Sequence, residues 1–159
     1  LDAARFRVAL ARAAGVDPAD VEATALGAHG EEMVPVASLA RIKGRALDAF
    51  LTAEAVEAAA RDAVTGGGQV VALKKTGSAT LAPAHATVEL IDHIRGARSG
   101  WAPASVMLEG EYGIEGVVLG VPCHLGAGGL VAVEEAPLTE TERAALARAA
   151  EAIRGRLGL

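Results

Sequence analysis

Three stretches, ASVMLE (residues 104–109), GVVLGVPCH (116–124) and GLVAVEE (129–135), decide the fold class of this chain. Each is short and mostly aliphatic and ends next to turn-forming glycine or acidic residues, a pattern typical of β-strands. Only the glycine-rich segment 126–129 separates the last two stretches, so we expect them to form a hairpin. Strands joined by so short a loop run antiparallel.

Ahead of these strands, residues 2–14 are predicted to form a helix that ends at Gly15. The apolar side chains that recur at helical spacing are Phe6, Leu10 and Ala13. Residues 21–28 alternate loosely between apolar and polar and predict a strand that delivers His29 at its end. Residues 33–36 predict a further extended piece.

More helices are predicted between and after the strands. Helical periodicity covers residues 52–64 and about 78–95, and the intervening Gly66–Gly68 is interpreted as a hinge between two helices. The last helix starts at Thr139, where Glu142 three residues later completes a capping box.

Because helices flank a run of strands instead of alternating with them, the pattern predicts an α+β fold. We expect a largely antiparallel, twisted sheet packed with helices. A chain of 159 residues fits one domain, so residues 1–159 are expected to be a single domain.

Composition narrows the classes of partner. The chain has 15 Lys and Arg against 20 Asp and Glu, a net charge of −5, so no basic excess favours nucleic acid or an anionic membrane. Cys123 is the single cysteine, which excludes an intrachain disulfide and a thiolate metal cluster and suits a reducing, cytoplasmic setting. No stretch is apolar for the roughly 18–20 residues that a membrane-spanning helix needs.

No dinucleotide-binding fingerprint is present. The sequence has no Gly-x-Gly-x-x-Gly between a predicted strand and a predicted helix, and Gly66–Gly68 is followed by Gln-Val-Val, which matches no phosphate-binding loop. We therefore expect this chain to bind no dinucleotide by itself.

Asp2, Arg5 and His29 are the candidates for chemistry. Asp2 and Arg5 are three residues apart on a predicted helix and therefore share a face, which by itself is typical of a surface ion pair. His29 ends a predicted strand before Gly30, where a side chain can face a cleft; a lone histidine there is more often a surface or core residue. The other histidines, among them His85 and His93, have poor spacing for a metal, and no metal is expected.

Five segments carry a more specific signal. They are LDAARFR (1–7), LGAHGEEMVP (26–35), KTGSA (75–79), LEGEYG (108–113) and GVPCHLG (120–126). In their order and separation they resemble the C-terminal domain of the lactate/malate dehydrogenase family, and in detail its malate branch. Three departures lie beside the key positions: Ala3 replaces a usual serine, Glu31 a common aspartate, and Thr80-Leu81 two frequent tyrosines.

The resemblance implies a role for each candidate. His29 matches the family's proton acceptor, Asp2 the carboxylate that orients it, and Arg5 the guanidinium that grips the carboxylate of a 2-hydroxy or 2-keto acid. Such chemistry needs a side chain that titrates near neutral pH, which histidine supplies. Met33 and Ser78 are expected to line the substrate pocket.

The resemblance also implies partners. The substrate is expected to be a small dicarboxylate or another 2-hydroxy or 2-keto acid, and the intact enzyme a homo-oligomer. NAD is expected to be held by an N-terminal Rossmann domain that is absent from this chain, so the chain alone is expected to carry no cofactor and to be inactive.

Three alternatives stay open. The first is the corresponding half of a lactate dehydrogenase, and the second is a stand-alone carboxylate-binding or assembly module that kept the fold. A hydrolase that uses His29 lacks a nucleophile, because the sequence has no Gly-x-Ser-x-Gly elbow.

Overall fold

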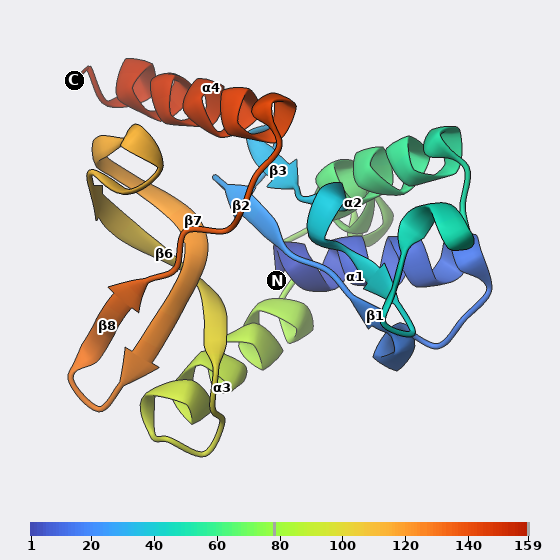
Figure 1. Ribbon diagram of the computed structural model, residues 1–159, viewed down its shortest axis with the longest axis horizontal. Coiled ribbons are helices and arrows are strands. Elements are labelled where there is room, and N and C mark those ends of the chain that lie inside the picture. The colour runs from blue at the N-terminus through green and yellow to red at the C-terminus, as the bar shows by residue number, and fades with distance from the viewer. Residues whose placement is uncertain (78, 159) are drawn as a thin grey trace.

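The main sheet is organised around its longest strand, β7 (Figure 1). In the computed structural model, which describes residues 1–77 and 79–158, the sheet has the order β3-β2-β7-β6, with β8 paired to β7. A smaller sheet has the order β1-β4-β5. The strands are β1 (Val21–Glu22), β2 (Ala25–Gly27), β3 (Met33–Pro35), β4 (Arg41–Ile42), β5 (Arg45–Ala46), β6 (Trp101–Glu109), β7 (Glu115–Gly126) and β8 (Gly129–Val133).

Four α-helices surround these sheets in the described part of the chain. They are α1 (Asp2–Ala14), α2 (Ala53–Lys74), α3 (Leu81–Ile94) and α4 (Glu140–Leu157). All strand pairings among the described residues are antiparallel. The predicted α+β class, with a largely antiparallel sheet packed with helices, is confirmed.

The hairpin predicted between the last two strands is present, with Gly126 opposite Gly129. Along β7 the side chains of Val117, Leu119 and Val121 are buried, whereas Gly116 and Val118 between and before them are exposed. This period of two places one face of the strand in the core. That core also includes Leu146 of α4, which crosses the sheet at the top of Figure 1.

The strand predicted over residues 21–28 is divided in the structure. β1 pairs with β4 in the small sheet, whereas β2 pairs with β3 and β7 in the main sheet. Thr24 lies between them, and its carbonyl accepts a hydrogen bond from the Val36 N–H at 3.0 Å, next to the Ala25–Pro35 pair of β2 and β3. Residues 21–28 do alternate between apolar and polar, but the first part of this segment belongs to the small sheet and the second part to the main sheet.

The interpretation of Gly66–Gly68 as a hinge is wrong. α2 continues through these glycines as one helix from its Thr52 N-cap to Lys74. Each glycine inside a helix costs about 1 kcal/mol relative to alanine, so local preference opposes this helix. Packing against α1 provides the compensation: Ala59 and Ala63 of α2 are buried in one cluster with Phe6 and Leu10 of α1.

The other helices begin and end much as predicted. α1 ends at Gly15, whose left-handed φ of 67° lets its N–H reach back to the last turn. Of its expected apolar face, Phe6 and Leu10 are fully buried but Ala13 is exposed. α4 has the predicted capping box between Thr139 and Glu142.

α3 is unusual because it carries large apolar side chains on its outer surface as well as on its inner one. Leu81 is 86% exposed, and Val88 and Ile91 are exposed too. Pro83, Ala86 and Leu90 face inward, where they line cavities. Within residues 1–77 and 79–158, no helix has the length and hydropathy required to cross a membrane.

Candidate active site

The first turn of α1 presents both Asp2 and Arg5. Side chains three residues apart lie on the same side of a helix, and here Arg5 Nη1 is 3.5 Å from Asp2 Oδ1. A carboxylate is also stabilised at this end of the helix by the partial positive charge of its free N–H groups. Both side chains are largely covered, with 18% and 21% of their surface exposed.

His29 lies in the tight loop between β2 and β3. Gly27 and Gly30, on either side of it, have positive φ angles of 88° and 103°, which glycine adopts without strain. The Ala28 N–H donates to the Glu32 carbonyl at 3.2 Å, and the Met33 N–H to the Gly30 carbonyl at 3.1 Å. The loop therefore holds His29 at the end of β2, as the sequence predicted.

α1 and this loop bring Asp2 and His29 together across 27 residues of sequence. Nδ1 of His29 lies 2.8 Å and 3.0 Å from the two carboxylate oxygens of Asp2. An Nδ1–H that donates to this carboxylate leaves Nε2 with a free lone pair, because a neutral imidazole carries one proton. Asp2 thus contacts Arg5 on one side and orients the ring of His29 on the other.

Arg5 and His29 line the same cavity, of about 360 Å³. α2 forms its far wall through Val64, Gly67 and Val71, and Pro83 of α3 closes another side. A cavity of this size, with a cation and an imidazole on its wall, is suited to a small organic acid. A neighbouring cavity of about 310 Å³ is lined by Asp2 and His29, together with Ser105 and Gly120 of the sheet.

The two expected pocket residues fare differently. Met33 is only 5% exposed and belongs to the core cluster of Phe6 and Leu10, and it lines a cavity beside α4 instead of either cavity at His29. Ser78 lies outside the described residues. The structure adds Val64 and Gly67 of α2 to the lining of the cavity, and sequence reasoning missed both. The available signal was the run of three glycines that directly follows the helical periodicity of residues 52–64.

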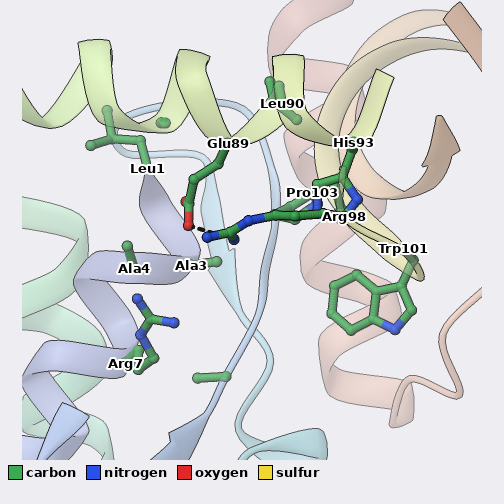
Figure 2. Close-up of a pocket in the computed structure, with 13 residues that line it drawn as sticks. Leu1, Ala3, Ala4, Arg7, Glu89, Leu90, His93, Arg98, Trp101 and Pro103 are labelled. Carbon is green, nitrogen blue, oxygen red and sulfur yellow. Dashed lines mark hydrogen bonds and ion pairs between the residues drawn. The ribbon is translucent and has the colours of Figure 1, made fainter. Parts of the chain in front are cut away.

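Figure 2 shows a separate cavity of about 230 Å³ between α1, α3 and β6. Glu89 and Arg98 meet across it in an ion pair of 2.9 Å, while Arg7 and Trp101 lie at its edge. Its described lining includes neither Arg5 nor His29. The arrangement of carboxylate, imidazole and guanidinium therefore belongs to the other side of α1.

Cys123 does not contribute a nucleophile to the site. Its side chain is fully buried, with Sγ 3.3 Å from the Val121 carbonyl, and this burial raises the pKa of the thiol. The adjacent His124 points to the opposite face of β7, where its Nε2 lies 3.0 Å from a Glu134 carboxylate oxygen. Among the residues that the structure describes, no three His, Cys, Asp or Glu side chains are grouped to hold a metal ion.

Comparison with known proteins places this arrangement in context. Residues 1–157 match the family described as lactate/malate dehydrogenase, alpha/beta C-terminal domain. A malate dehydrogenase of Roseiflexus sp. strain RS-1 is 42% identical over 153 residues, which cover 96% of this chain and 50% of that protein.

Solved structures of the same family match the fold of this chain closely. The malate dehydrogenase of Cryptosporidium parvum superposes with a TM-score of 0.94 at 33% identity, over 99% of this chain and 52% of that one. A lactate dehydrogenase of the same organism, solved with lactic acid and nicotinamide adenine dinucleotide, gives a TM-score of 0.92 at 30% identity, over 97% and 50%. The chain spans about half the length of the relatives it matches.

Proposed function

Because the chain belongs to the lactate/malate dehydrogenase family, as its α/β C-terminal domain, we propose that it is the catalytic half of an NAD-dependent malate dehydrogenase. The reaction of the intact enzyme is malate plus NAD⁺ to oxaloacetate, NADH and a proton. The observation that carries this proposal is that Asp2 contacts both His29 and Arg5, and that these two side chains line one cavity. The identity to malate dehydrogenases supports the choice of substrate.

His29 acts as the base toward the substrate hydroxyl. Nε2 accepts the hydroxyl proton while the hydride leaves the carbon that carries this hydroxyl, so the ring becomes an imidazolium. Asp2, 2.8 Å from Nδ1, holds the ring in the required tautomer and stabilises the positive charge that forms. In the reverse direction the imidazolium returns the proton to the keto oxygen of oxaloacetate.

Arg5 holds the substrate's carboxylate next to the reacting carbon. A guanidinium can donate two parallel hydrogen bonds to a carboxylate and so fix its plane, which an ammonium cannot. Charge-assisted bonds of this kind contribute about 1.5–3 kcal/mol each. With Arg5 and His29 on one cavity wall, the hydroxyl of the same molecule is directed toward the ring.

The described residues do not fit the dinucleotide itself. Its pyrophosphate is usually held where a parallel strand leads through a glycine-rich turn into a helix, whereas the strands here pair antiparallel. We assign NAD binding to an N-terminal Rossmann half, and the bound cofactor supplies the hydride acceptor. Residues 1–159 alone are then a single substrate-binding domain, expected to show no turnover.

Further features of the intact enzyme are part of the proposal. We expect a homo-oligomer, which the exposed Leu81, Val88 and Ile91 of α3 support because contiguous apolar surface marks protein contacts. The free thiol of Cys123 suits a reducing compartment, and we propose the cytoplasm.

The test is the intact polypeptide, assayed for oxaloacetate-dependent oxidation of NADH, together with a His29→Asn variant. We expect turnover in the wild type and a fall in kcat of about 10²–10⁴-fold in the variant. Activity that survives within a few-fold would sink the assignment of His29.

The same assay decides between the alternatives. A preference for pyruvate over oxaloacetate would favour a lactate dehydrogenase, to which the fold is also closely similar. Binding of oxaloacetate without turnover, by the wild-type protein with NADH present, would favour a carboxylate-binding module.

A further inference from the structure

Gly67 lies directly against the guanidinium of Arg5. A Cβ built on Gly67 would be 3.0 Å from Nη1, 3.2 Å from Nη2 and 3.4 Å from Cζ of Arg5. Contacts between 3.0 and 3.4 Å are tighter than nine in ten real Cβ contacts. A side chain at this position would therefore require the guanidinium to shift by a few tenths of an ångström.

These distances also show the direction of approach. The Cβ would be nearer to both terminal nitrogens than to the central carbon, so it would approach from the side of the edge formed by Nη1 and Nη2. That edge carries the two parallel donors that a bidentate carboxylate contact uses. A methyl group there would obstruct the donors and occupy space that a bound carboxylate needs.

The other two glycines of the run make no such contact. At Gly66 the nearest atom to a Cβ would be Cδ of Arg5 at 3.8 Å, an ordinary van der Waals distance. At Gly68 nothing lies within 4 Å. Of the three successive glycines in this helix, only Gly67 has a steric reason to lack a side chain.

We propose that Gly67 is a positioning residue, which leaves the edge formed by the two terminal nitrogens of Arg5 open to the carboxylate of the substrate. This inference rests on the proposed function, because it takes Arg5 to be the group that binds this carboxylate. Gly67 lines the cavity shared by Arg5 and His29, which places the obstruction where the acid would lie. The helix thus tolerates an unfavourable residue in its interior because the site requires the open space.

The experiment compares Gly67→Ala with Gly66→Ala in the intact enzyme, using oxaloacetate and NADH. Gly67→Ala is expected to raise KM for oxaloacetate about 10–100-fold, the loss of one or more charge-assisted hydrogen bonds, with a smaller change in kcat. Gly66→Ala is the matched control, with the same substitution in the same helix, and should leave KM within about twofold. Neither variant should melt below the wild type, because alanine favours a helix. Equal KM values for the two variants would overturn the proposal.

Two further variants separate obstruction of Arg5 from simple narrowing of the cavity. Gly68 also lines the cavity, but its Cβ would not approach Arg5. If Gly68→Ala raises KM as much as Gly67→Ala, narrowing is the cause and the proposal fails. In an Arg5→Lys background, which has no forked donor edge, adding Gly67→Ala should raise KM less than about threefold. A full 10–100-fold increase in that background would also contradict it.

A binding measurement distinguishes failure of this inference from failure of the proposed function. Hydroxymalonate is a 2-hydroxy dicarboxylate that differs from malate. It is titrated calorimetrically into the wild type, Gly67→Ala and Gly66→Ala with NADH present. Weaker binding to Gly67→Ala than to Gly66→Ala supports the role of Gly67 even if turnover of oxaloacetate is absent. Wild-type turnover with unchanged binding in Gly67→Ala defeats this inference alone. Absence of both turnover and binding in the wild type defeats both.

Discussion

Gly27 and Glu32 meet backbone to backbone across the loop that holds His29: a Cβ built on Gly27 would lie 2.3 Å from the Glu32 carbonyl oxygen. That oxygen already accepts the Ala28 N–H at 3.2 Å, and Gly27 has a positive φ of 88°. The conformation that presents His29 therefore depends on the absence of a side chain at Gly27.

Gly27→Ala is expected to destabilise the protein by at least about 2 kcal/mol, because it combines a steric clash with an unfavourable φ. The shift of the urea midpoint measures the loss. Gly30→Ala is the matched control: its φ of 103° is also positive, but a Cβ there would have nothing within 4 Å. If both variants lose the same stability, backbone strain alone explains the loop, and the Gly27–Glu32 contact is unimportant.

Asp2→Asn should lower kcat of the intact enzyme by about 10²–10⁴-fold with a much smaller change in KM. An amide can hydrogen-bond to Nδ1, but it favours the wrong tautomer and gives no charge to stabilise the imidazolium. Steady-state kinetics with oxaloacetate measure the effect. Asp48→Asn, an exposed acid outside the lining of both cavities at His29, should behave as the wild type. A loss confined to KM would show that Asp2 acts on Arg5 instead of on His29.

Local sequence rules predicted much of this fold. The strands over 104–135, the helix ending at Gly15 and the capping box at Thr139 follow from periodicity and end signals, and the structure has all of them. Asp2 and Arg5 were expected on one helix face because their spacing requires it. Nothing in that spacing placed His29 beside Asp2; the expectation came from resemblance to a family.

The misjudged segments share one physical cause. Glycine has a poor intrinsic preference for helices, so Gly66–Gly68 suggested a break, yet packing of α2 on α1 outweighs that preference. Residues 21–28 alternate as one strand does, but they serve two sheets. Each outcome depends on partners distant in sequence, which local rules do not contain.

Glu142 is expected to stabilise the start of α4 in a pH-dependent manner. Burial raises the pKa of Glu142, but hydrogen bonds from Ser38 and Thr139 outweigh this, so the net pKa lies below its ordinary value of 4.5. A carboxyl whose pKa is lower when folded stabilises the protein above its unfolded pKa, and the stabilisation is lost as pH falls through the folded value.

Glu142→Gln should therefore reduce stability by about 1 kcal/mol at neutral pH, allowing for the partial exposure of this carboxylate. The difference from wild type should shrink as pH falls below 4.5. Urea denaturation at several pH values measures it. Glu140→Gln, in the first turn of the same helix, is the control for a general loss of negative charge. A difference between Glu142→Gln and wild type that stays constant down to low pH would exclude the carboxylate as its source.

Cys123 should resist alkylation until the main sheet opens. Its thiol is fully buried in β7 between β6 and β8, and because burial raises its pKa, little thiolate forms near neutral pH. A reagent such as iodoacetamide attacks the thiolate, so reaction requires β7 to leave its neighbours, and the labelling rate in native buffer should follow the unfolding equilibrium. Mass spectrometry in increasing urea measures this dependence. Val131→Cys provides the exposed reference, since Val131 on β8 is 71% exposed, and this variant should gain one rapidly labelled thiol. If Cys123 of the wild type were alkylated as fast as that introduced thiol without urea, β7 would not be the stable centre of the sheet.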